Sequence, residues 1–363
     1  MPIVLDGSNG ITQAEQFNSD STFGFKNRII NGAMTISQRG TSSFTAADNL
    51  YTLDRWVCAV NPASKFTVIQ SSDAPAGFNN SLLVTSSSAY TVGAAEYETI
   101  AQRIEGYNIA DLGFGTASAK TITISFWVKS SLTGSFGAAI TNLGETRCYP
   151  FSYTISAANT WEQKSVTIAG DTSGSWGTTT STGINLYISL GTGTNLSGTA
   201  NAWTSSAKVQ PTGSVSVVGT NGATFYITGV QLEVGSTATS FDYRPYGTEL
   251  MLCQRYFQGT TNANDGNNYY YGSGSNLTSS IAYITYPFLA SMRTSPTLTS
   301  SGTFQIRGGG NSETVTSVSL VTSTTTTAGV NFTVGGATLT VGYGVVARSG
   351  ASTANTLFFS AEL

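Results

Sequence analysis

The residues of this chain that could do chemistry are its carboxylates, because none of its 363 residues is a histidine. Without histidine there is no Ser-His-Asp or Cys-His arrangement and no histidine metal triad. Paired-carboxylate hydrolysis of a glycoside remains, and it needs two acidic side chains roughly 5–10 Å apart. The candidates are Asp48 with Asp54, and Glu96, Glu98 and Glu105 among themselves. Nothing in the sequence brings them to one cleft, so we expect solvated surface acids and no enzyme.

Cofactor and metal signals are weak. Cys58, Cys148 and Cys253 are odd in number and lack CxxC spacing, which indicates buried thiols and neither a disulfide framework nor a zinc site. The glycine-rich stretches "GFGTAS" and "RGGGNSE" lack the P-loop lysine and are interpreted as turns. We therefore expect no cofactor, and a structural calcium held by backbone carbonyls and scattered carboxylates is left open.

Aromatic side chains are the remaining candidates for binding, because their flat faces suit the CH surface of a sugar. Two tryptophans lie in the polar loops "TSGSWGTTTST" and "GTANAWTSS", a third lies opposite the apolar face of its strand, and three tyrosines are consecutive. The glycan-binding candidates are thus Trp176, Trp203, Trp127, Tyr269, Tyr270 and Tyr271. The alternative for each is a place in the core.

Composition narrows the class of protein. Hydrophobic residues make up 40% of the chain but charged residues only 10%, and the net charge is −3, so no basic surface for nucleic acid is expected. "MPIVLDGSNG" lacks the basic region and apolar core of a secretory signal, and no apolar run is long enough for membrane insertion. We expect synthesis in the cytoplasm. The abundance of Ser, Thr, Asn and 40 glycines favours short strands and turns, which predicts an all-β protein.

Alternation of apolar and polar residues locates the strands. In "KTITISFWVKSS" the residues Ile122, Ile124, Phe126 and Val128 share one face, and "TGINLYISLG" repeats the pattern. Many such segments without helical periodicity predict a jelly-roll β-sandwich over residues 27–246. The preceding arm, residues 1–26, is interpreted either as a disordered terminus or as an arm that docks on a partner.

The stretch "ITGVQLEVGSTATSFDYRPYGTELMLCQRYFQG" predicts how the sandwich ends. The apolar residues move from odd to even positions at Gly229, which indicates a β-bulge. Pro245 ends the strand pairing because proline has no backbone N–H to donate. A connector helix follows over residues 247–259, with Thr248 as N-cap and Gly259 as its C-terminal stop.

A second, smaller β domain is expected over residues 260–363. Its clearest pattern, "VNFTVGGATLTVGYGVV", predicts a hairpin with Val330 to Val334 on one arm, Leu339 to Tyr343 on the other, and a turn at Gly335-Gly336.

Several of these stretches resemble a known family. "NRIINGAMTISQRGT", "YTLDRWV", "SFWVKSS", "FYITGVQLEVGSTATSFDYRP" and "YGTELMLCQRYFQ" are similar to the carbohydrate-binding-module-like jelly roll in tail-fibre, appendage and other structural proteins of tailed bacteriophages. The resemblance covers about residues 27–258. It implies a virion component that is oligomeric and often trimeric, projects outward and contacts host glycans. No catalytic residues come with it.

Three functions follow as hypotheses. The first is a tail fibre or appendage of the virion, a homotrimer attached to other virion proteins through the N-terminal arm and binding a host-surface glycan. The second is a purely architectural capsid decoration, head or collar fibre without a ligand. The third, a polysaccharide depolymerase, is disfavoured by the absence of a long parallel β-helix pattern.

Overall fold

The chain forms two compact units. In the computed structural model, residues 4–6, 10–13, 25–262, 269–308, 311–350 and 355–363 are described. The N-terminal unit takes Met1–Thr35, Ser43–Thr52 and Trp56–Tyr246, and the C-terminal unit takes Ile36–Ser42, Leu53–Arg55 and Gly247–Leu363. The main division thus falls between Tyr246 and Gly247. The two short segments that join the C-terminal unit from early in the chain were not predicted.

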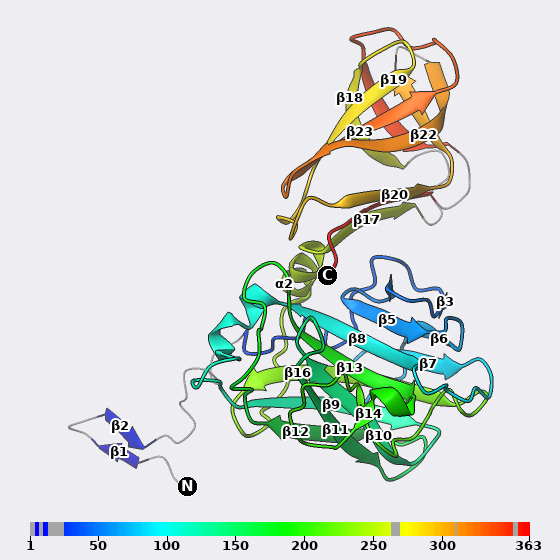
Figure 1. Cartoon of the computed structure of the whole chain (residues 1–363). Coiled ribbons are helices and arrows are strands. Elements are labelled where there is room, and N and C mark those ends of the chain that lie inside the picture. Colours follow the sequence, from blue (N-terminus) through cyan, green and yellow to red (C-terminus); the bar gives the residue numbers. More distant parts are fainter. Residues whose placement is uncertain (1–3, 7–9, 14–24, 263–268, 309–310, 351–354) are drawn as a thin grey trace. The chain divides into compact units, whose positions relative to one another are not determined.

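The N-terminal unit is a jelly-roll sandwich of two six-stranded antiparallel sheets, as predicted (Figure 1). The first sheet has the order β11-β10-β13-β8-β5-β4 and the second the order β12-β9-β16-β7-β6-β3. The strands of the first sheet are β4 (Leu50–Tyr51), β5 (Trp56–Asn61), β8 (Tyr97–Glu105), β10 (Gly134–Thr141), β11 (Cys148–Ile155) and β13 (Thr182–Thr192). Those of the second are β3 (Phe44–Thr45), β6 (Phe66–Ser71), β7 (Ser81–Ser86), β9 (Ile122–Ser130), β12 (Glu162–Ile168) and β16 (Thr224–Val234).

Shorter elements complete this unit. They are the antiparallel pair β1 (Val4–Asp6) and β2 (Gly10–Gln13), the parallel pair β14 (Ser197–Gly198) and β15 (Gln210–Pro211), and the 3-10 turns η1 (Gly106–Asn108), η2 (Ala110–Leu112) and η3 (Thr194–Leu196). The pair β1-β2 lies within the predicted arm, and most of the rest of the arm lies outside the described residues. Docking of the arm on a partner stays a prediction.

The core lies between the two sheets and is formed by the predicted alternating faces. Ile122, Ile124, Phe126 and Val128 of β9 have no exposed surface, and the same holds for the apolar face of β13. Alternation predicted these strands correctly because each has one face against the core.

The β-bulge at Gly229 is confirmed. The pairing of β16 with β9 shifts register between Thr228 and Gln231, and Gly229 has a φ of 61°. A Cβ atom there would lie 2.6 Å from Phe78 and 3.1 Å from Trp127. Both the backbone conformation and the close ring therefore require glycine at this position.

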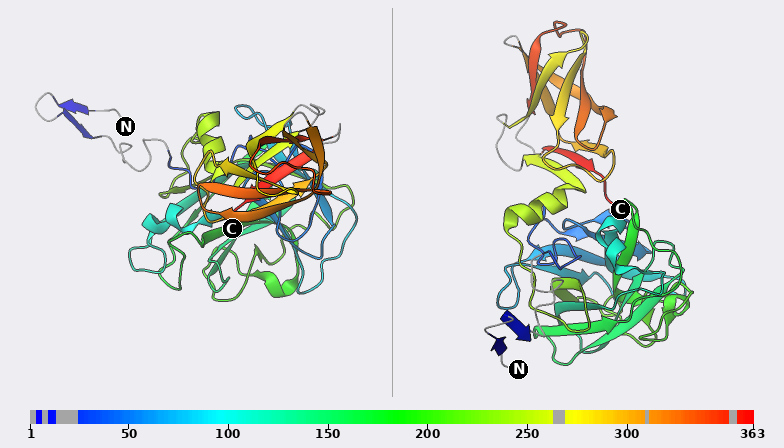
Figure 2. Two further views of the ribbon diagram at one scale, coloured as in Figure 1. Left: turned by 90° about the horizontal axis from the view of Figure 1, so that it is seen from above. Right: turned by 90° about the vertical axis from the view of Figure 1, so that its left-hand side faces the viewer.

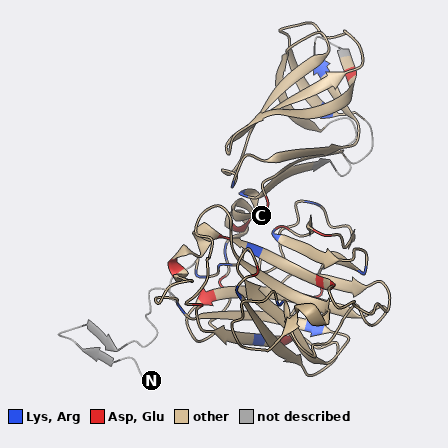
Figure 3. Ribbon diagram, in the orientation of Figure 1, with Lys and Arg blue, Asp and Glu red and all other residues tan. Residues whose placement is uncertain are grey.

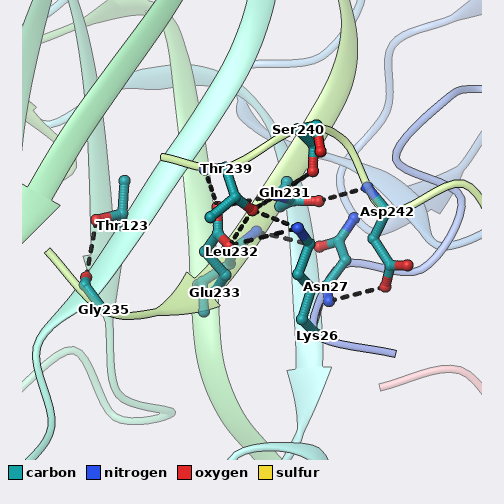
Figure 4. Close-up of polar contacts among 10 residues, drawn as sticks. All are labelled: Lys26, Asn27, Thr123, Gln231, Leu232, Glu233, Gly235, Thr239, Ser240 and Asp242. Carbon is teal, nitrogen blue, oxygen red and sulfur yellow. Dashed lines mark hydrogen bonds and ion pairs between the residues drawn. The ribbon is translucent and has the colours of Figure 1, made fainter. Parts of the chain in front are cut away.

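Beyond the bulge, buried polar side chains fasten the start of the sandwich to its last strand (Figure 4). The Asn27 side chain accepts hydrogen bonds from the amides of Ile29 (2.9 Å) and Leu232 (3.1 Å) and donates one to the carbonyl of Val230 (3.0 Å). The buried Glu233 carboxylate instead holds the segment that follows β16, because it accepts hydrogen bonds from the amide and hydroxyl of Thr239 as well as from the Gln231 amide group.

We expect replacement of Asn27 by alanine to lower the free energy of unfolding by about 2–4 kcal/mol, because it leaves several buried backbone groups without partners. Urea unfolding followed by tryptophan fluorescence measures this change. The matched substitution at an exposed position, Asn195→Ala, should stay within about 0.5 kcal/mol of the unchanged chain. Equal losses for the two variants would contradict the assigned role of Asn27.

The C-terminal unit contains a helix, a three-stranded sheet and a closed six-stranded barrel (Figure 2). The helix is α2 (Tyr246–Gln254), and the sheet has the order β17 (Phe257–Asn262), β25 (Asn355–Ser360), β20 (Thr297–Ser301). The barrel has the order β18 (Tyr270–Asn276), β19 (Ile281–Pro287), β23 (Thr327–Val334), β22 (Asn311–Ser323), β21 (Phe304–Gly308), β24 (Gly344–Ser349). Closure leaves this barrel without a free strand edge.

The predicted bounds of the helix were wrong. α2 begins at Tyr246, directly after Pro245, so Thr248 lies inside the first turn and is not the N-cap. Gly259 lies within β17 opposite Phe358 and does not end the helix. Pairing with β25 draws residues from Phe257 onward into the sheet, and a local helical pattern does not reveal that partner.

The predicted hairpin at Gly335-Gly336 was also wrong. β23 pairs with β19 on one side and β22 on the other, so no edge remains for the residues that follow it. Those residues form a connection in which Val341 is 61% and Tyr343 56% exposed, and the next strand, β24, begins at Gly344. Barrel closure overrode the local hairpin signal.

The two short early segments are bound tightly within the C-terminal unit. Arg55, which is 1% exposed, forms an ion pair with Glu362, and its guanidinium lies 3.6 Å from the ring centre of Tyr256. Arg39 also pairs with Glu362, at 3.0 Å. The Asp54 carboxylate accepts hydrogen bonds from the backbone amide and the side chain of Gln38. This unit is therefore assembled from three separate parts of the chain.

Candidate functional site

The first sheet of the N-terminal unit has an apolar strip on the face opposite the core. Val57, Ala101 and Tyr187 lie in register on β5, β8 and β13 and pack together, with Ala59 beside them. The neighbouring residues on these strands, such as Ile100, point into the core. Strand alternation therefore places Tyr97 and Arg103 of β8 on the same outer face.

A hollow of about 260 Å³ lies on this face, which we call the sheet-face hollow. Its lining residues are Asp48, Asn49, Ala59, Tyr97, Arg103, Glu145, Tyr187, Leu196 and Val209. Its volume is close to the lower end of the roughly 300–1,000 Å³ that is typical of ligand sites. Hollows in the C-terminal unit measure about 130 and 60 Å³.

Charged groups are concentrated in this hollow. Lys, Arg, Asp and Glu make up 10% of the chain and are thinly spread over it (Figure 3). Yet Asp48, Arg103 and Glu145 are three of the nine lining residues. An apolar floor with a few converging polar groups is the usual composition of a small-molecule site.

One side of the rim is the turn before β4. The Asp48 carboxylate accepts a hydrogen bond from the amide of Val60 (3.2 Å), which holds the turn against β5. Asn49 has a φ of 58°, a left-handed conformation that asparagine tolerates, and its side-chain oxygen accepts a hydrogen bond from Arg103 (2.5 Å). The turn thus fixes the position of the Arg103 guanidinium.

A second side of the rim is the turn between β10 and β11, which carries Glu145. The Asn142 side chain accepts hydrogen bonds from the amides of Thr146 (2.9 Å) and Arg147 (3.1 Å) and so shapes this turn. Glu145 has a φ of 52°, which is uncommon for glutamate and carries an energetic cost. Its carboxylate accepts a hydrogen bond from the Tyr187 hydroxyl (2.8 Å). A costly backbone conformation therefore holds a carboxylate at the hollow.

The third side is apolar and comes from the segment after β13. The Val209 amide donates to the carbonyl of Leu196 (2.9 Å), so both side chains are placed by one short contact. Gln210 anchors the segment to the sheet, because its side-chain oxygen accepts a hydrogen bond from Ser189 (2.6 Å). Together the three sides surround the strip of Ala59 and Tyr187.

Two groups at the hollow remain open to a ligand. Within the part of the chain that the structure describes, neither the Tyr97 hydroxyl nor the second oxygen of the Glu145 carboxylate has a hydrogen-bond partner. Tyr97 also offers a half-buried aromatic ring. The arrangement can hold a ring with one apolar face and several hydroxyl groups.

The tryptophans predicted from polar loops lie elsewhere, in an aromatic cluster. Trp176 is 8% exposed, and its ring packs on Phe114 (4.9 Å between centres) and Trp203 (5.7 Å). The indole N–H of Trp176 donates to the carbonyl of Ser173, and that of Trp203 to the carbonyl of Ala169. Little of the Trp176 face is open to a sugar, whereas Trp203 is half-buried.

The other aromatic candidates are also separate from the hollow. Trp127 is half-buried on the outer face of the second sheet, near Gly229. Tyr270 is 54% exposed, whereas Tyr271 is 7% exposed and donates to the carbonyl of Asn355. Tyr269 is half-buried and packs on Tyr271.

The acidic residues do not all lie at the surface as expected. Asp54, Glu98 and Glu105 are buried, and only Asp48 of the five candidates lines the sheet-face hollow. Its acidic companion there is Glu145, which the sequence did not single out.

The prediction for the cysteines has a direct counterpart in the structure. The three cysteines are free and buried, as predicted, and burial raises the pKa of the Cys58 thiol to about 12. Among the described residues no three His, Cys, Asp or Glu side chains group as they would around a metal ion. No helix in the described ranges has the length and apolar character needed to cross a membrane.

Of the nine lining residues only Asp48 was a candidate from the sequence, and those missed include Tyr97, Arg103, Glu145 and Tyr187. Tyr97 and Arg103 could have been found from alternation. Both lie at odd positions of a strand whose even positions include the apolar residues Ile100 and Ile104, so they face away from the core. Glu145 could not, because only the sheet order brings its turn beside β8 and β13.

Comparison with known proteins finds likeness in structure only. No family model matches the chain, and neither does any curated protein sequence. Among solved structures, the enzymatically active domain of bacteriophage CBA120 tailspike protein 4 aligns over 58% of this chain with 12% identity and a TM-score of 0.32, but this covers only 22% of the tailspike chain. The family 11 carbohydrate-binding module of Clostridium thermocellum, solved with a β-1,3-1,4-mixed-linked tetrasaccharide, aligns over 55% of this chain and 99% of its own, at 12% identity and a TM-score of 0.29. The C-terminal family 22 module of C. thermocellum Xyn10B aligns over 51% of this chain and 89% of its own, at 14% identity and a TM-score of 0.28.

Proposed function

We propose that the N-terminal unit binds a glycan in the sheet-face hollow. The observation that carries this proposal is the hollow itself: an apolar strip flanked by Tyr97, with Glu145 and Arg103 held by fixed hydrogen bonds at its rim. A pyranose ring has an apolar CH face and a girdle of hydroxyls, which suits an aromatic ring beside converging polar groups. The left-handed backbone at Glu145 supports the proposal, because strained residues are concentrated at binding sites.

We also propose that the chain is a non-catalytic component of a tailed-phage particle that recognises the host surface. The support is the sequence resemblance over about residues 27–258. On this proposal the chain is a homotrimer, attached to other virion proteins through residues 1–26. Electron microscopy of the particle with an antibody to this chain tests the location, and light scattering of the purified protein tests the trimer.

A glycan array followed by calorimetric titration tests binding at the hollow. We expect Tyr97→Ala to weaken binding of the best array ligand by at least about tenfold, because it removes the ring and the open hydroxyl together. Trp127→Ala, on the outer face of the second sheet, is the matched control and should leave affinity unchanged.

Three outcomes would contradict the proposal in different ways. An affinity lost with Trp127→Ala and kept with Tyr97→Ala would move the site to the other sheet. No binding anywhere on the array would favour an architectural protein. Release of reducing ends from host polysaccharide would indicate a depolymerase and point to Asp48 and Glu145 as the acidic pair to replace.

A further inference from the structure

The charge of the sheet-face hollow is unbalanced. Its lining holds two carboxylates, Asp48 and Glu145, against one guanidinium, Arg103, so one negative charge is in excess. One amino group of the guanidinium donates to Asn49 at 2.5 Å and so holds the guanidinium at the rim. One oxygen of Glu145, in contrast, has no hydrogen-bond partner among the described residues.

The excess negative charge affects the pKa values of the tyrosines in the hollow. Burial raises the pKa of Tyr97, and the nearby carboxylates Asp48 and Glu145 raise it further, against a smaller opposing effect of Arg103. The pKa of Tyr187 is also raised, by burial and by Glu145. Both hydroxyls therefore remain protonated over the neutral pH range, and the open groups comprise a neutral phenol and a carboxylate oxygen that can only accept.

We infer that the sugar bound in the sheet-face hollow carries no acidic group, so that neutral and amino sugars enter and uronic or sialic acids are rejected. This inference rests on the proposed glycan binding and adds the class of sugar. A carboxylate in the ligand would lie near the open oxygen of Glu145, and like charges brought together in a partly dehydrated site weaken binding. A hydroxyl or ammonium group in the same place donates a hydrogen bond to that oxygen.

Matched pairs of oligosaccharides test the inference on the full chain. Each uronic-acid oligosaccharide is compared with its carboxyl-reduced form, which has the same linkages and ring size but no charge. At low ionic strength, where screening is weak, we expect reduced forms to bind at least about tenfold more tightly than acidic forms. Glu145→Gln should shrink this preference, whereas Glu162→Gln, the same charge change on β12, should leave it intact.

The outcomes separate the two proposals. Binding of acidic and reduced forms with equal affinity, or a preference for acidic forms, would overturn the charge inference while leaving glycan binding in place. A preference that Glu145→Gln and Glu162→Gln alter equally would overturn the role of Glu145. Binding of neither form, with neutral and amino oligosaccharides of other linkages also inert, would overturn both proposals. Melting temperatures of the two variants check that each remains folded.

Discussion

Replacing Glu98 with glutamine should make the protein more stable than the unchanged chain at alkaline pH. Glu98 lies on β8 with no exposed surface, and both carboxylate oxygens are buried without a hydrogen-bond partner. Burial raises its pKa from the usual 4.5 to about 8, an effect that Lys65 reduces and Glu96 reinforces. The folded protein thus keeps the carboxyl protonated at neutral pH.

The sign of the pH dependence follows from the two pKa values. Below about pH 4.5 the carboxyl is protonated in the folded and the unfolded chain, and this site gives no slope. Between about 4.5 and about 8 the folded chain holds one more proton, so the free energy of unfolding falls as the pH rises, by about 1.4 kcal/mol per unit. Above about 8 the fall is complete. The glutamine amide of the Glu98→Gln variant does not ionise, so this site causes no fall in its free energy of unfolding.

The measurement is urea unfolding of both proteins from pH 4 to pH 9. At pH 9 we expect the free energy of unfolding of Glu98→Gln to exceed that of the unchanged chain by roughly 2–4 kcal/mol. The difference is smaller than the pKa shift alone would give, because some water reaches the ionised carboxylate and lowers the cost of its burial. Glu162→Gln is the control, because the pKa of Glu162 is lowered, chiefly by its hydrogen bond with Lys164, and should not remove the alkaline fall. Parallel curves for Glu98→Gln and the unchanged chain would show that the buried carboxyl does not control this window.

The second large effect is expected at Glu362, next to the C-terminal residue. Glu362→Gln removes the negative partner of both Arg39 and Arg55 and leaves two guanidinium groups in a largely buried place. Breaking one partner of a buried pair costs about 3–5 kcal/mol, because the remaining charge stays desolvated. The C-terminal unit should therefore melt at a lower temperature.

The position of the tryptophans allows this effect to be assigned to one unit. All five, Trp56, Trp127, Trp161, Trp176 and Trp203, belong to the N-terminal unit. Calorimetry should show a transition in Glu362→Gln that moves down in temperature without a change in tryptophan fluorescence. Adding Arg55→Met should recover part of the loss, because it removes one of the two positive charges that pair with Glu362. If the double variant lost as much stability as the sum of the losses of the two single variants, or more, this would contradict the pairing.

The sequence predicted strands and the bulge correctly where the outcome depended only on which face of a single strand packs against the core. The alternation around Phe126 and the parity change at Gly229 each reflect a single strand against a core, so a local pattern was sufficient. It failed where a partner strand decided the outcome. Gly259 joined a sheet because β25 pairs there, and Leu339 to Tyr343 lost their predicted hairpin because both edges of β23 were already occupied.

Composition and alternation alone indicate that this chain is built from β-strands, has little charge and has no histidine for catalysis or metal binding. The position of the sheet-face hollow, in contrast, depends on the tertiary structure. Tyr97, Arg103 and Glu145 meet because the sheet order places β8 beside β13 and β13 beside β10. The ion pair of Arg55 with Glu362 likewise depends on the folding of distant segments onto each other. Both cases have one cause, because hydrogen-bonded pairing between strands and ion pairing between distant segments depend on contacts that no local pattern of residues encodes.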